Sequence, residues 1–402
     1  MKIGIVAPDF PPYIGGMPTY AVNLSRELQR RGHKVFVFTC TGMGESNEVH
    51  DLTVHRILTR NFLSDQKILS SWKMDLWHVI NASYCVLSLC KSHVIASIHS
   101  KDFINPWIFP LFRVKVFSKL MKWPYVWRFN WRFIDSSIEL FGSKFLLFLG
   151  YRKTKMIFAN SSYTADRFNK KYPGNKSRVK ITYAGVEPSF FEVPRRSDHR
   201  RRKRILTVCR LSRNSTIKNV DKVISALSLL RNKFDFEYWV VGDGTLRGDL
   251  ENLAYKSGIG DRVRFLGFVS QSTLREIYSV CDIFVLTSSV NEKNFEGFGI
   301  VYLEANATGI PVLACRQGGA IDAVKEGISG MFVDIPSEEE IADKLAQFLS
   351  GELRFNELEI RQHARKFLWT KIVDDMEQTY FDIINDKDGF KLSSKKILNI
   401  SN

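Results

Sequence analysis

The amino-acid sequence predicts an α/β protein built from two doubly wound, Rossmann-like lobes that face each other across a cleft. Short apolar runs alternate with helical patterns, and this alternation begins again after a basic segment near the middle of the chain. Strands separated by helices form parallel sheets that are covered on both faces, and 402 residues suffice for two such domains. Because ligands of such sheets bind beyond the carboxyl ends of the strands, we expect functional residues in the loops that follow strands.

The first lobe is predicted to span residues 1–192. A loop rich in proline and glycine, PPYIGG, follows its first strand, and Tyr20, Leu24 and Leu28 then give the apolar face of a helix that ends near Gly32. The predicted strands of this lobe are Lys2–Ala7, Lys34–Thr39, Leu76–Ile80, His93–Ile98, Lys155–Ala159 and Val179–Tyr183.

The second lobe is predicted over residues 205–385, after a basic linker at 193–204 and before a polar tail at 386–402. Helices Glu338–Leu349 and Lys371–Asn385 are expected to close it, because their apolar residues recur at helical spacing. The predicted strands of this lobe are Ile205–Val208, Glu237–Val241, Val263–Leu266, Ile283–Leu286, Pro311–Ala314 and Gly330–Val333.

The net charge of +16 is concentrated in the first half of the chain. Residues 1–193 have 27 Lys and Arg against 13 Asp and Glu, residues 194–204 have 7 against 1, and residues 205–402 have 24 against 28. This asymmetry indicates two lobes with different partners. We interpret the run at 195–204 as a solvated linker, with contact to a membrane surface or to nucleic acid as the alternatives.

The sequence predicts a cytoplasmic protein without a bound metal. Its six Cys residues lie far apart, with no Cys-x-x-Cys and no Cys/His ligand spacing, so neither a disulfide framework nor a zinc site is expected. The chain begins with a strand-like run instead of a signal-peptide pattern. No apolar stretch reaches the roughly 18 residues of a membrane span. We therefore expect at most a peripheral association with the inner face of the cytoplasmic membrane.

Residues 103–150 are predicted to form an insertion in the first lobe. Eleven aromatic and six basic residues are interleaved at 103–133, and helical spacing places Trp and Arg in separate rows. Such a pattern is typical of a helix in a lipid interface; the alternative is that the rings pack in the core. No nucleic-acid partner is expected, because no known nucleic-acid module accompanies these rings. The candidate contacts to a membrane or a lipid acceptor are Trp123, Trp127, Arg128, Trp131 and Arg132.

The strongest functional signal is the segment Glu296–Ala305, EGFGIVYLEA. A Gly-Phe-Gly turn opens a helix near Ile300, so free backbone N–H groups and the positive end of the helix dipole would face the cleft as an anion site. The glycines let a phosphate approach the chain closely. One turn further on, Glu304 is placed to accept hydrogen bonds from sugar hydroxyls, and Glu296 lies at the mouth of the loop.

These residues resemble the signature of the retaining glycosyltransferases of family 4, which have the GT-B fold. Glu296 and Glu304 match the Glu-x7-Glu pattern of that family. The similarity extends over nearly the whole chain, through IGIVAPDFPPYIGG, AGVEPSFF, VVGDGTLRGDLE, RVRFLGFVS and VCDIFVLTSS in the family's order. The segment EGFGIVYLEANATGIPVLACRQGGAIDAV is most similar to a subgroup that resembles the phosphatidylinositol mannosyltransferases.

The resemblance implies a role for each matched residue. Arg210 and Lys218 would hold the donor's diphosphate and stabilise the charge that builds on it as the glycosidic bond breaks. Glu304 would bind the ribose, Glu296 would contact the donor sugar, and His99 would lie near the reacting sugar. Of these, Arg210, Lys218, Glu296 and His99 are the predicted catalytic residues. The further implied donor-binding positions are Gly15, Gly16, Gly297, Phe298, Gly299 and Ile300.

The sequence departs from the family pattern around the predicted lysine. Lys218 follows Arg210 by eight residues where many members have about five, and Asn219 stands where Gly is usual. Arg213 is therefore an alternative phosphate ligand. The pair Asn160–Ser161 resembles the family's Asn-Ser step at the start of a helix, and an ordinary N-cap is an equally good interpretation of it.

The predicted function is transfer of a sugar, with retention of configuration, from a UDP- or GDP-linked donor to a lipid-linked or membrane-associated glycan acceptor. The setting implied by the resemblance is bacterial surface-polysaccharide, lipopolysaccharide or glycolipid synthesis. No cofactor or metal is expected besides the nucleotide-sugar co-substrate, since GT-B enzymes normally need no catalytic metal. The alternatives are a GT-B nucleotide-sugar epimerase and a non-catalytic protein that binds membranes or polyanions.

Overall fold

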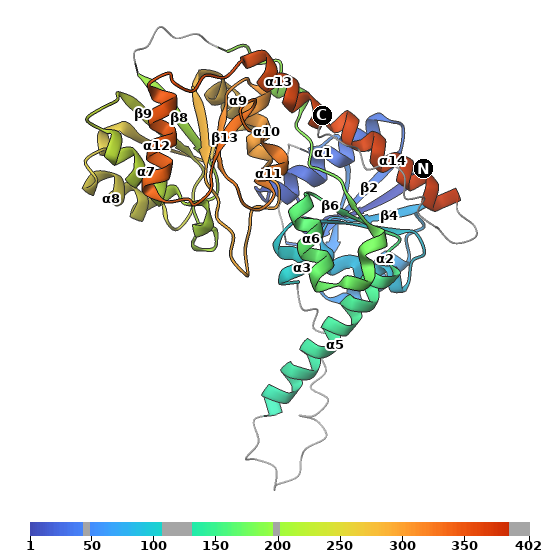
Figure 1. Ribbon diagram of the computed structural model, residues 1–402. Coiled ribbons are helices and arrows are strands. Elements are labelled where there is room, and N and C mark those ends of the chain that lie inside the picture. The colour runs from blue at the N-terminus through green and yellow to red at the C-terminus, as the bar shows by residue number, and fades with distance from the viewer. Residues whose placement is uncertain (43–48, 107–130, 196–201, 386–402) are drawn as a thin grey trace.

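The computed structural model describes residues 1–42, 49–106, 131–195 and 202–385, and it contains two α/β lobes, each built on a parallel sheet (Figure 1). The first sheet has seven strands in the order β3-β2-β1-β4-β5-β6-β7, so the chain winds outward in both directions from β1. This is the predicted doubly wound arrangement. Its strands are β1 (Lys2–Val6), β2 (Lys34–Cys40), β3 (Thr53–Leu58), β4 (Leu76–Val79), β5 (Val94–Ile98), β6 (Met156–Ala159) and β7 (Val179–Ile181).

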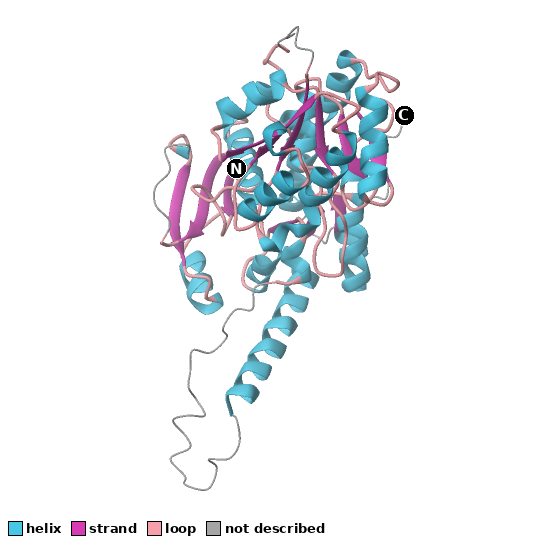
Figure 2. Ribbon diagram, turned by 90° about the vertical axis from the view of Figure 1, so that its left-hand side faces the viewer, coloured by secondary structure: helices cyan, strands magenta, loops and turns pink. Residues whose placement is uncertain are grey.

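The helices of the first lobe include one that projects far from the body of the protein, α5 (Figures 1 and 2). The first helix, α1, buries Tyr20, Leu24 and Leu28 as predicted, and the chain turns after it at Gly32, where φ is 86°. The α-helices are α1 (Gly16–Arg30), α2 (Phe62–Ser70), α3 (Lys101–Ile104), α5 (Trp131–Lys153) and α6 (Ser162–Lys171). Short 3₁₀ helices span Ala82–Leu89, Pro173–Arg178 and Pro188–Phe190.

The second lobe has a six-stranded parallel sheet in the order β10-β9-β8-β11-β12-β13. Its strands are β8 (Lys203–Val208), β9 (Phe236–Val241), β10 (Val263–Gly267), β11 (Ile283–Leu286), β12 (Val312–Cys315) and β13 (Gly330–Val333). The α-helices are α7 (Val220–Leu230), α8 (Arg247–Lys256), α9 (Gln271–Val280), α10 (Ile300–Ala307), α11 (Ala320–Ala323), α12 (Glu338–Leu349), α13 (Glu357–Ala364) and α14 (Trp369–Asn385). Short 3₁₀ helices span Arg213–Lys218, Gly260–Arg262 and Arg365–Phe367.

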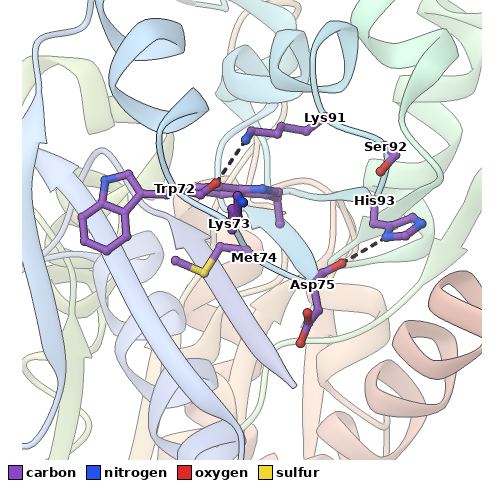
Figure 3. A pocket seen from close by; sticks show the side chains of 8 residues that line it. Trp72, Lys73, Met74, Asp75, Lys91, Ser92 and His93 are labelled. Carbon is purple, nitrogen blue, oxygen red and sulfur yellow. Dashed lines mark hydrogen bonds between the residues drawn. The ribbon is translucent and has the colours of Figure 1, made fainter.

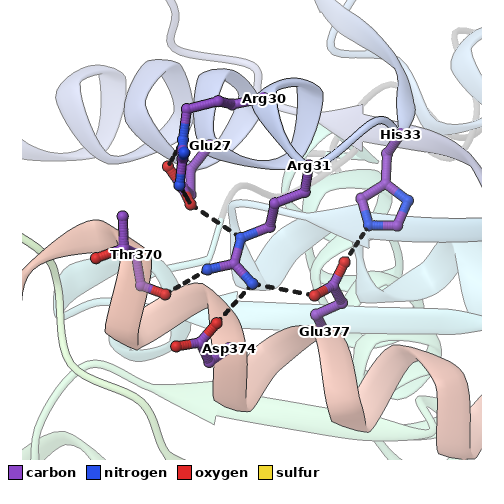
Figure 4. A network of polar contacts seen from close by, with 7 residues as sticks. All are labelled: Glu27, Arg30, Arg31, His33, Thr370, Asp374 and Glu377. Atoms are coloured by element: carbon purple, nitrogen blue, oxygen red, sulfur yellow. Dashed lines mark hydrogen bonds and ion pairs between the residues drawn. The ribbon is translucent and has the colours of Figure 1, made fainter.

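The last helix, α14, returns to the first lobe and packs against α1, whereas the sequence analysis places its residues in the second lobe. Arg31, which follows α1, donates to Asp374 and Glu377 on α14 at 2.7 and 3.0 Å, and to Glu27 at 2.9 Å (Figure 4). The Nε2 atom of His33 lies 2.6 Å from the other carboxylate oxygen of Glu377. An ion-pair network thus fastens the end of the described chain to its first helix.

Buried hydrogen bonds anchor α14 to the centre of the first sheet. The hydroxyl of Tyr380 lies 2.6 Å from Nδ1 of His78 on β4, and Nε2 of that ring lies 2.7 Å from the hydroxyl of Ser97 on β5. Ser97 in turn contacts the hydroxyl of Tyr20 on α1 at 3.0 Å. Burial lowers the pKa of His78 to about 3, so the ring is neutral and can donate one bond and accept the other.

The structure differs from the sequence prediction at the edges of the sheets. Strand β3 is not predicted, because the edge segment TVHRIL is only partly buried and lacks a continuous apolar run. Strand β8 begins at Lys203, so the last two residues of the predicted linker belong to a strand.

The predicted lipid contacts fall on the least described part of the molecule. Trp123, Trp127 and Arg128 lie outside the described residues, and Trp131 and Arg132 begin α5. Among the described residues, no helix combines the length and the apolar character needed to span a bilayer.

Candidate active site

The loop between β11 and α10 forms the centre of the candidate site. Gly299, just before α10, has a φ of 88°, and a Cβ there would lie 2.3 Å from the ring of Tyr302. Both facts require glycine. The hydroxyl of Tyr302 donates to the carbonyl of Leu286 at 2.8 Å, which ties the first turn of α10 to the end of β11. No side chain of the described residues caps α10, so its first N–H groups, beginning at Ile300, are available to an anion.

A second glycine loop packs against the first. The N–H of Gly319 donates to the carbonyl of Glu296 at 2.9 Å, and a Cβ on Gly319 would lie 2.0 Å from the carbonyl oxygen of Gly297. The side chain of Phe298 is buried and stacks on Tyr183, with ring centroids 5.4 Å apart. Because the ring packs in the core, Phe298 would contact a nucleotide-sugar donor through its backbone.

Glu304 lies one turn into α10 and is only 6% exposed. Its carboxylate accepts a hydrogen bond of 3.1 Å from the hydroxyl of Tyr278 on α9. Burial raises the pKa of Glu304 to about 7, a shift that the Tyr278 bond opposes and the carboxylate of Glu187 reinforces. Hydroxyl groups of a ligand that donate to this carboxylate would favour its ionised form.

Glu296 and Lys218 form an ion pair, and the hydroxyl of Ser288 lies 3.4 Å from the same carboxylate oxygen. Asn219, directly after the lysine, has a left-handed backbone with φ 54° and ψ 35°, and its amide donates to the carbonyl of Thr287 at 2.6 Å. Asn tolerates this conformation better than most residues, which explains why it can stand where the family has Gly. Lys218 therefore reaches Glu296 although it follows Arg210 by eight residues.

Arg210 follows β8 and points to the first lobe. A Cβ on Gly15 would lie 3.0 Å from Nη2 of Arg210, so glycine leaves room for the guanidinium. Within the described part of the chain, Arg210 has no hydrogen bond or ion pair. Burial raises the pKa of Asp9, and the charges of Arg60 and Arg210 oppose that shift. Gly16 begins α1, with open space where its side chain would be. An exposed cation thus faces the glycine loop.

His99 follows β5 and is buried edge-on against Tyr20, with ring centroids 4.6 Å apart. Asp102 fixes this turn by accepting hydrogen bonds of 3.1 Å from the N–H groups of His99 and Ser100. Burial lowers the pKa of His99, although the charge of Asp102 opposes the shift. The imidazole is therefore neutral at pH 7 and can either donate or accept a hydrogen bond through Nε2.

Two buried polar atoms at the interface between the lobes lack a partner among the described residues: Nε2 of His99 and Oδ1 of Asn160. A Cβ on Gly297 would lie 2.5 Å from the carbonyl oxygen of His99 and 2.8 Å from Nδ2 of Asn160. Buried polar atoms are normally hydrogen-bonded. These two atoms are therefore available to a ligand beside the loop between β11 and α10 (residues 287–299), named the donor loop for its predicted role.

The structure gathers the predicted residues where the two lobes meet. Arg210, Lys218 and the segment Glu296–Glu304 come from the second lobe, and Gly15 and His99 come from the first. Their chemical roles stay predictions.

Sequence reasoning did not identify Tyr278, Thr164 or Asp322, whose contacts join elements far apart in the chain. The only sequence signal for any of them is the position of Asp322 just after the Gly318-Gly319 step.

Two cavities of the first lobe lie at opposite ends of its sheet. One of about 190 Å³ lies at the amino ends of β4 and β5 (Figure 3). Lys91 lines this cavity and donates to the carbonyls of Ser70 and Trp72 at 3.2 and 3.1 Å, so its ammonium group already has partners within the fold. The second, of about 180 Å³, is lined by Tyr13, Cys40, Thr41, Gly42, Leu58, Thr59 and Arg60. Among the described residues, no three His, Cys, Asp or Glu side chains are grouped as metal ligands would be.

The sequence matches known proteins along most of its length. Residues 14–190 match the family model Glycosyltransferase Family 4, and residues 191–367 match the model Glycosyl transferases group 1. An uncharacterized glycosyltransferase of Methanocaldococcus jannaschii is 26% identical, over 94% of this chain and 98% of that protein. The GDP-mannose-dependent alpha-(1-6)-phosphatidylinositol monomannoside mannosyltransferase of Mycobacterium tuberculosis is 33% identical, over 49% of this chain and 53% of that protein.

Solved structures share the fold. HepE of Anabaena, in complex with UDP and glucose, superposes with a TM-score of 0.70 at 18% identity, over 94% of this chain and 99% of that one. The lipopolysaccharide outer core galactosyltransferase WaaB, in its apo form, superposes with a TM-score of 0.69 at 16% identity, over 95% of this chain and 99% of that one.

Proposed function

Because the chain belongs to the family 4 glycosyltransferases and has their GT-B fold, we propose that it moves a sugar, with retention of configuration, from a nucleoside-diphosphate sugar to a lipid-linked glycan. The observation that carries this proposal is a set of groups around one place between the lobes. It comprises the cation of Arg210 and the start of α10, which have neither an ion-pair partner nor a side-chain cap among the described residues, and the buried carboxylate of Glu304.

The positive groups suit a departing diphosphate. As the bond between the sugar and the diphosphate breaks, negative charge builds on the leaving phosphate oxygen, and preorganised donors stabilise that charge. Arg210 and the first N–H groups of α10 are available for this role. Lys218 is paired with Glu296 in the structure. A bound diphosphate would compete for Lys218 and leave the Glu296 carboxylate to accept hydrogen bonds from the donor sugar.

Retention follows, in this proposal, from attack on the face that the diphosphate leaves. The acceptor oxygen forms the new bond to the sugar carbon, the bond to the diphosphate breaks, and the acceptor proton passes to the departing phosphate oxygen. Nε2 of His99 has no hydrogen-bond partner in the described part of the chain, which supports a role as a hydrogen-bonding partner of the sugar. No metal enters this scheme, since Arg210, Lys218 and α10 supply the positive charge.

The proposed donor is a UDP- or GDP-linked sugar. The structure of HepE contains UDP, and the mycobacterial relative is described as GDP-mannose-dependent. Both nucleotides therefore belong in the first experiment.

The cavity of about 180 Å³ supports a glycan acceptor on the first lobe. Its lining combines a half-exposed ring, Tyr13, which suits the face of a sugar, with the hydroxyl of Thr59 and the guanidinium of Arg60, whose bonds to Asp65 and Asp9 hold them in place. Arg60 donates to Asp9 at 2.9 Å, and the positive charge of Arg210 acts on the same carboxylate by lowering its pKa. The cavity therefore lies close to the proposed diphosphate site.

The projecting helix α5 supports a membrane-bound acceptor. Phe145 and Phe148 on this helix are 54% and 38% exposed, and the guanidinium of Arg152 lies 5.7 Å from the ring of Phe148. Exposed rings beside basic groups suit a lipid interface. We therefore propose a peripheral position on the inner face of the cytoplasmic membrane, in bacterial surface-polysaccharide, lipopolysaccharide or glycolipid synthesis.

A panel of UDP- and GDP-linked sugars, offered with lipid-linked glycans, tests the proposal. We expect one sugar to appear in a new glycosidic bond, with the donor's anomeric configuration by NMR and undiminished turnover in EDTA. An isomerised donor without a new bond would instead establish an epimerase. If neither UDP nor GDP raises the melting temperature while anionic vesicles do, the protein is a non-catalytic membrane binder.

A further inference from the structure

Helix α6 of the first lobe makes three contacts with the second lobe, and its first turn makes the closest of them. The N–H and the hydroxyl of Ser162 donate to the two carboxylate oxygens of Asp322 on α11, at 2.5 and 2.9 Å. Ser161 accepts a bond of 3.0 Å from the N–H of Thr164, and Asp322 accepts from a different N–H group of the same turn, that of Ser162. Asp322 thus caps α6 from the second lobe and joins the two lobes.

The second contact joins the two strand-end segments that carry the candidate site. The hydroxyl of Thr164 lies 3.1 Å from the carbonyl of His99 and 3.3 Å from the carbonyl of Gly297, and its single proton is shared between these two acceptors. One buried hydroxyl is therefore shared between the loop after β5 and the donor loop. The lack of room for a Cβ on Gly297, 2.5 Å from the His99 carbonyl, shows how closely these backbones approach.

The third contact is apolar and lies one residue before Glu296. Phe295, on the donor loop, is only 2% exposed and packs on the first lobe, with its ring 5.0 Å from Tyr163 on α6 and 6.4 Å from Phe103 on α3. The guanidinium of Arg167 lies 5.8 Å from the same ring. It also donates to the carbonyl of Glu292 at 2.8 Å.

We propose that the first two turns of α6 fix the position of the two lobes relative to each other for sugar transfer, with Thr164 and Asp322 as positioning residues. The inference rests on the proposed function and adds to it. Thr164 holds the His99 segment against Gly297, and Asp322 holds the amino end of α6 to the second lobe. Neither side chain needs to touch the donor. A small displacement of reacting groups lowers the rate strongly, so loss of either contact is expected to slow the chemical step.

Paired variants of Thr164 test the proposal in the full-length protein. Thr164→Val keeps the shape and removes the hydroxyl, whereas Thr164→Ser keeps the hydroxyl. We expect kcat for transfer to fall about 10- to 100-fold in T164V and to stay near wild type in T164S. The dissociation constants of UDP and GDP are expected to change far less than kcat in both variants, because Arg210, Glu304 and the first N–H groups of α10 lie outside the contact that T164V removes. A wild-type kcat in T164V, or an equal loss in T164S, would overturn the assignment.

Hydrogen exchange gives a readout that does not depend on activity. In T164V we expect faster exchange in the first turn of α6 and in the loop at 287–299, and in Asp322→Ala we expect it in the first turn of α6 and in α11, because each contact protects the segments that it joins. Lys170→Ala, at an exposed position in the last turn of α6, is the matched control and should change none of these segments. If the loop at 287–299 exchanges at the wild-type rate in T164V and α11 does so in D322A, the positioning role is refuted, even where the protein proves to be an active transferase.

Discussion

At the scale of single residues, Arg210 is the cation whose loss we expect to lower activity most. It is exposed, has no partner among the described residues and faces Gly15, so its removal leaves the fold intact while a diphosphate loses a charge-assisted bond. Arg210→Ala is therefore expected to lower kcat by about 10²- to 10³-fold with an unchanged melting temperature. Arg213→Ala is the matched control: should it lower kcat as much while R210A does not, Arg213 is the phosphate ligand instead.

The raised pKa of Glu304 predicts how the affinity for the nucleotide-sugar donor depends on pH. Burial raises this pKa to about 7, so below pH 7 the Glu304 carboxyl of the free protein is mostly protonated. It must lose this proton before the carboxylate can accept hydrogen bonds from the ribose hydroxyls. Binding of a sugar nucleotide, whose doubly esterified diphosphate does not titrate between pH 6 and 8, is therefore expected to tighten about tenfold over that range. Calorimetry should show proton release on binding, and Glu304→Gln should abolish both effects. A pH-independent affinity in the wild type would rule out this role.

The same shift affects stability with the opposite sign. Because the folded pKa of Glu304 lies above its ordinary value of 4.5, the folded protein retains a proton that the unfolded chain releases between these values. The resulting stabilisation is complete below pH 4.5 and is lost as pH rises through 7, by up to about 3 kcal/mol. The free energy of unfolding of E304Q should lack this component, whereas equal pH profiles for both proteins would show that folding does not shift the pKa of Glu304.

Single residues of the candidate site differ in how far sequence could predict them. Glu296 and Glu304 stand in a fixed local spacing, so the pattern alone places both beside one helix start. The partner of Glu304, Tyr278, lies 26 residues away on another helix, and Thr164 reaches Gly297 across 133 residues. No local pattern carries such contacts, because only tertiary packing creates them.

At the scale of elements, α14 is the clearest case of tertiary packing that periodicity does not reveal. Its apolar face predicts a helix over nearly the observed range, but nothing in that pattern says which lobe the helix covers. The ion pairs with Arg31 and His33, and the buried bond from Tyr380 to His78, assign it to the first lobe. Central strands were predictable because continuous apolar runs mark them, whereas the half-buried edge strand β3 has no such run.

The α14 network yields a stability prediction. The carboxylate of Glu377 accepts from Arg31 at 3.0 Å and contacts His33 at 2.6 Å, and all three side chains are at least four-fifths buried. Glu377→Ala should therefore lower the free energy of unfolding by about 1–2 kcal/mol. Gln378→Ala, which removes only an exposed bond to Asp382, is the control. Equal denaturation midpoints for the two variants would mean that the contacts of Glu377 do not stabilise the packing of α14.

At the scale of the whole molecule, charge and shape favour one orientation at a membrane. The excess of basic residues lies in the first half of the chain, and α5 extends from that same lobe, away from the second (Figure 1). Anionic lipid attracts basic segments by about 1 kcal/mol per Lys or Arg near the surface, and exposed rings add apolar contact. The first lobe would then face the membrane, with the proposed acceptor cavity on the same lobe.

Vesicle binding tests this orientation. Phe145→Ser with Phe148→Ser removes two exposed rings of α5, and we expect weaker co-sedimentation with anionic vesicles, because apolar burial of both rings is lost. Phe268→Ser is the matched control, since that ring is 59% exposed but follows β10 on the second lobe. Binding by the wild type should also fall with added salt, as contacts with an anionic surface do. If F268S weakens binding as much as the α5 variant, or if neither variant weakens it, then α5 does not contact lipid.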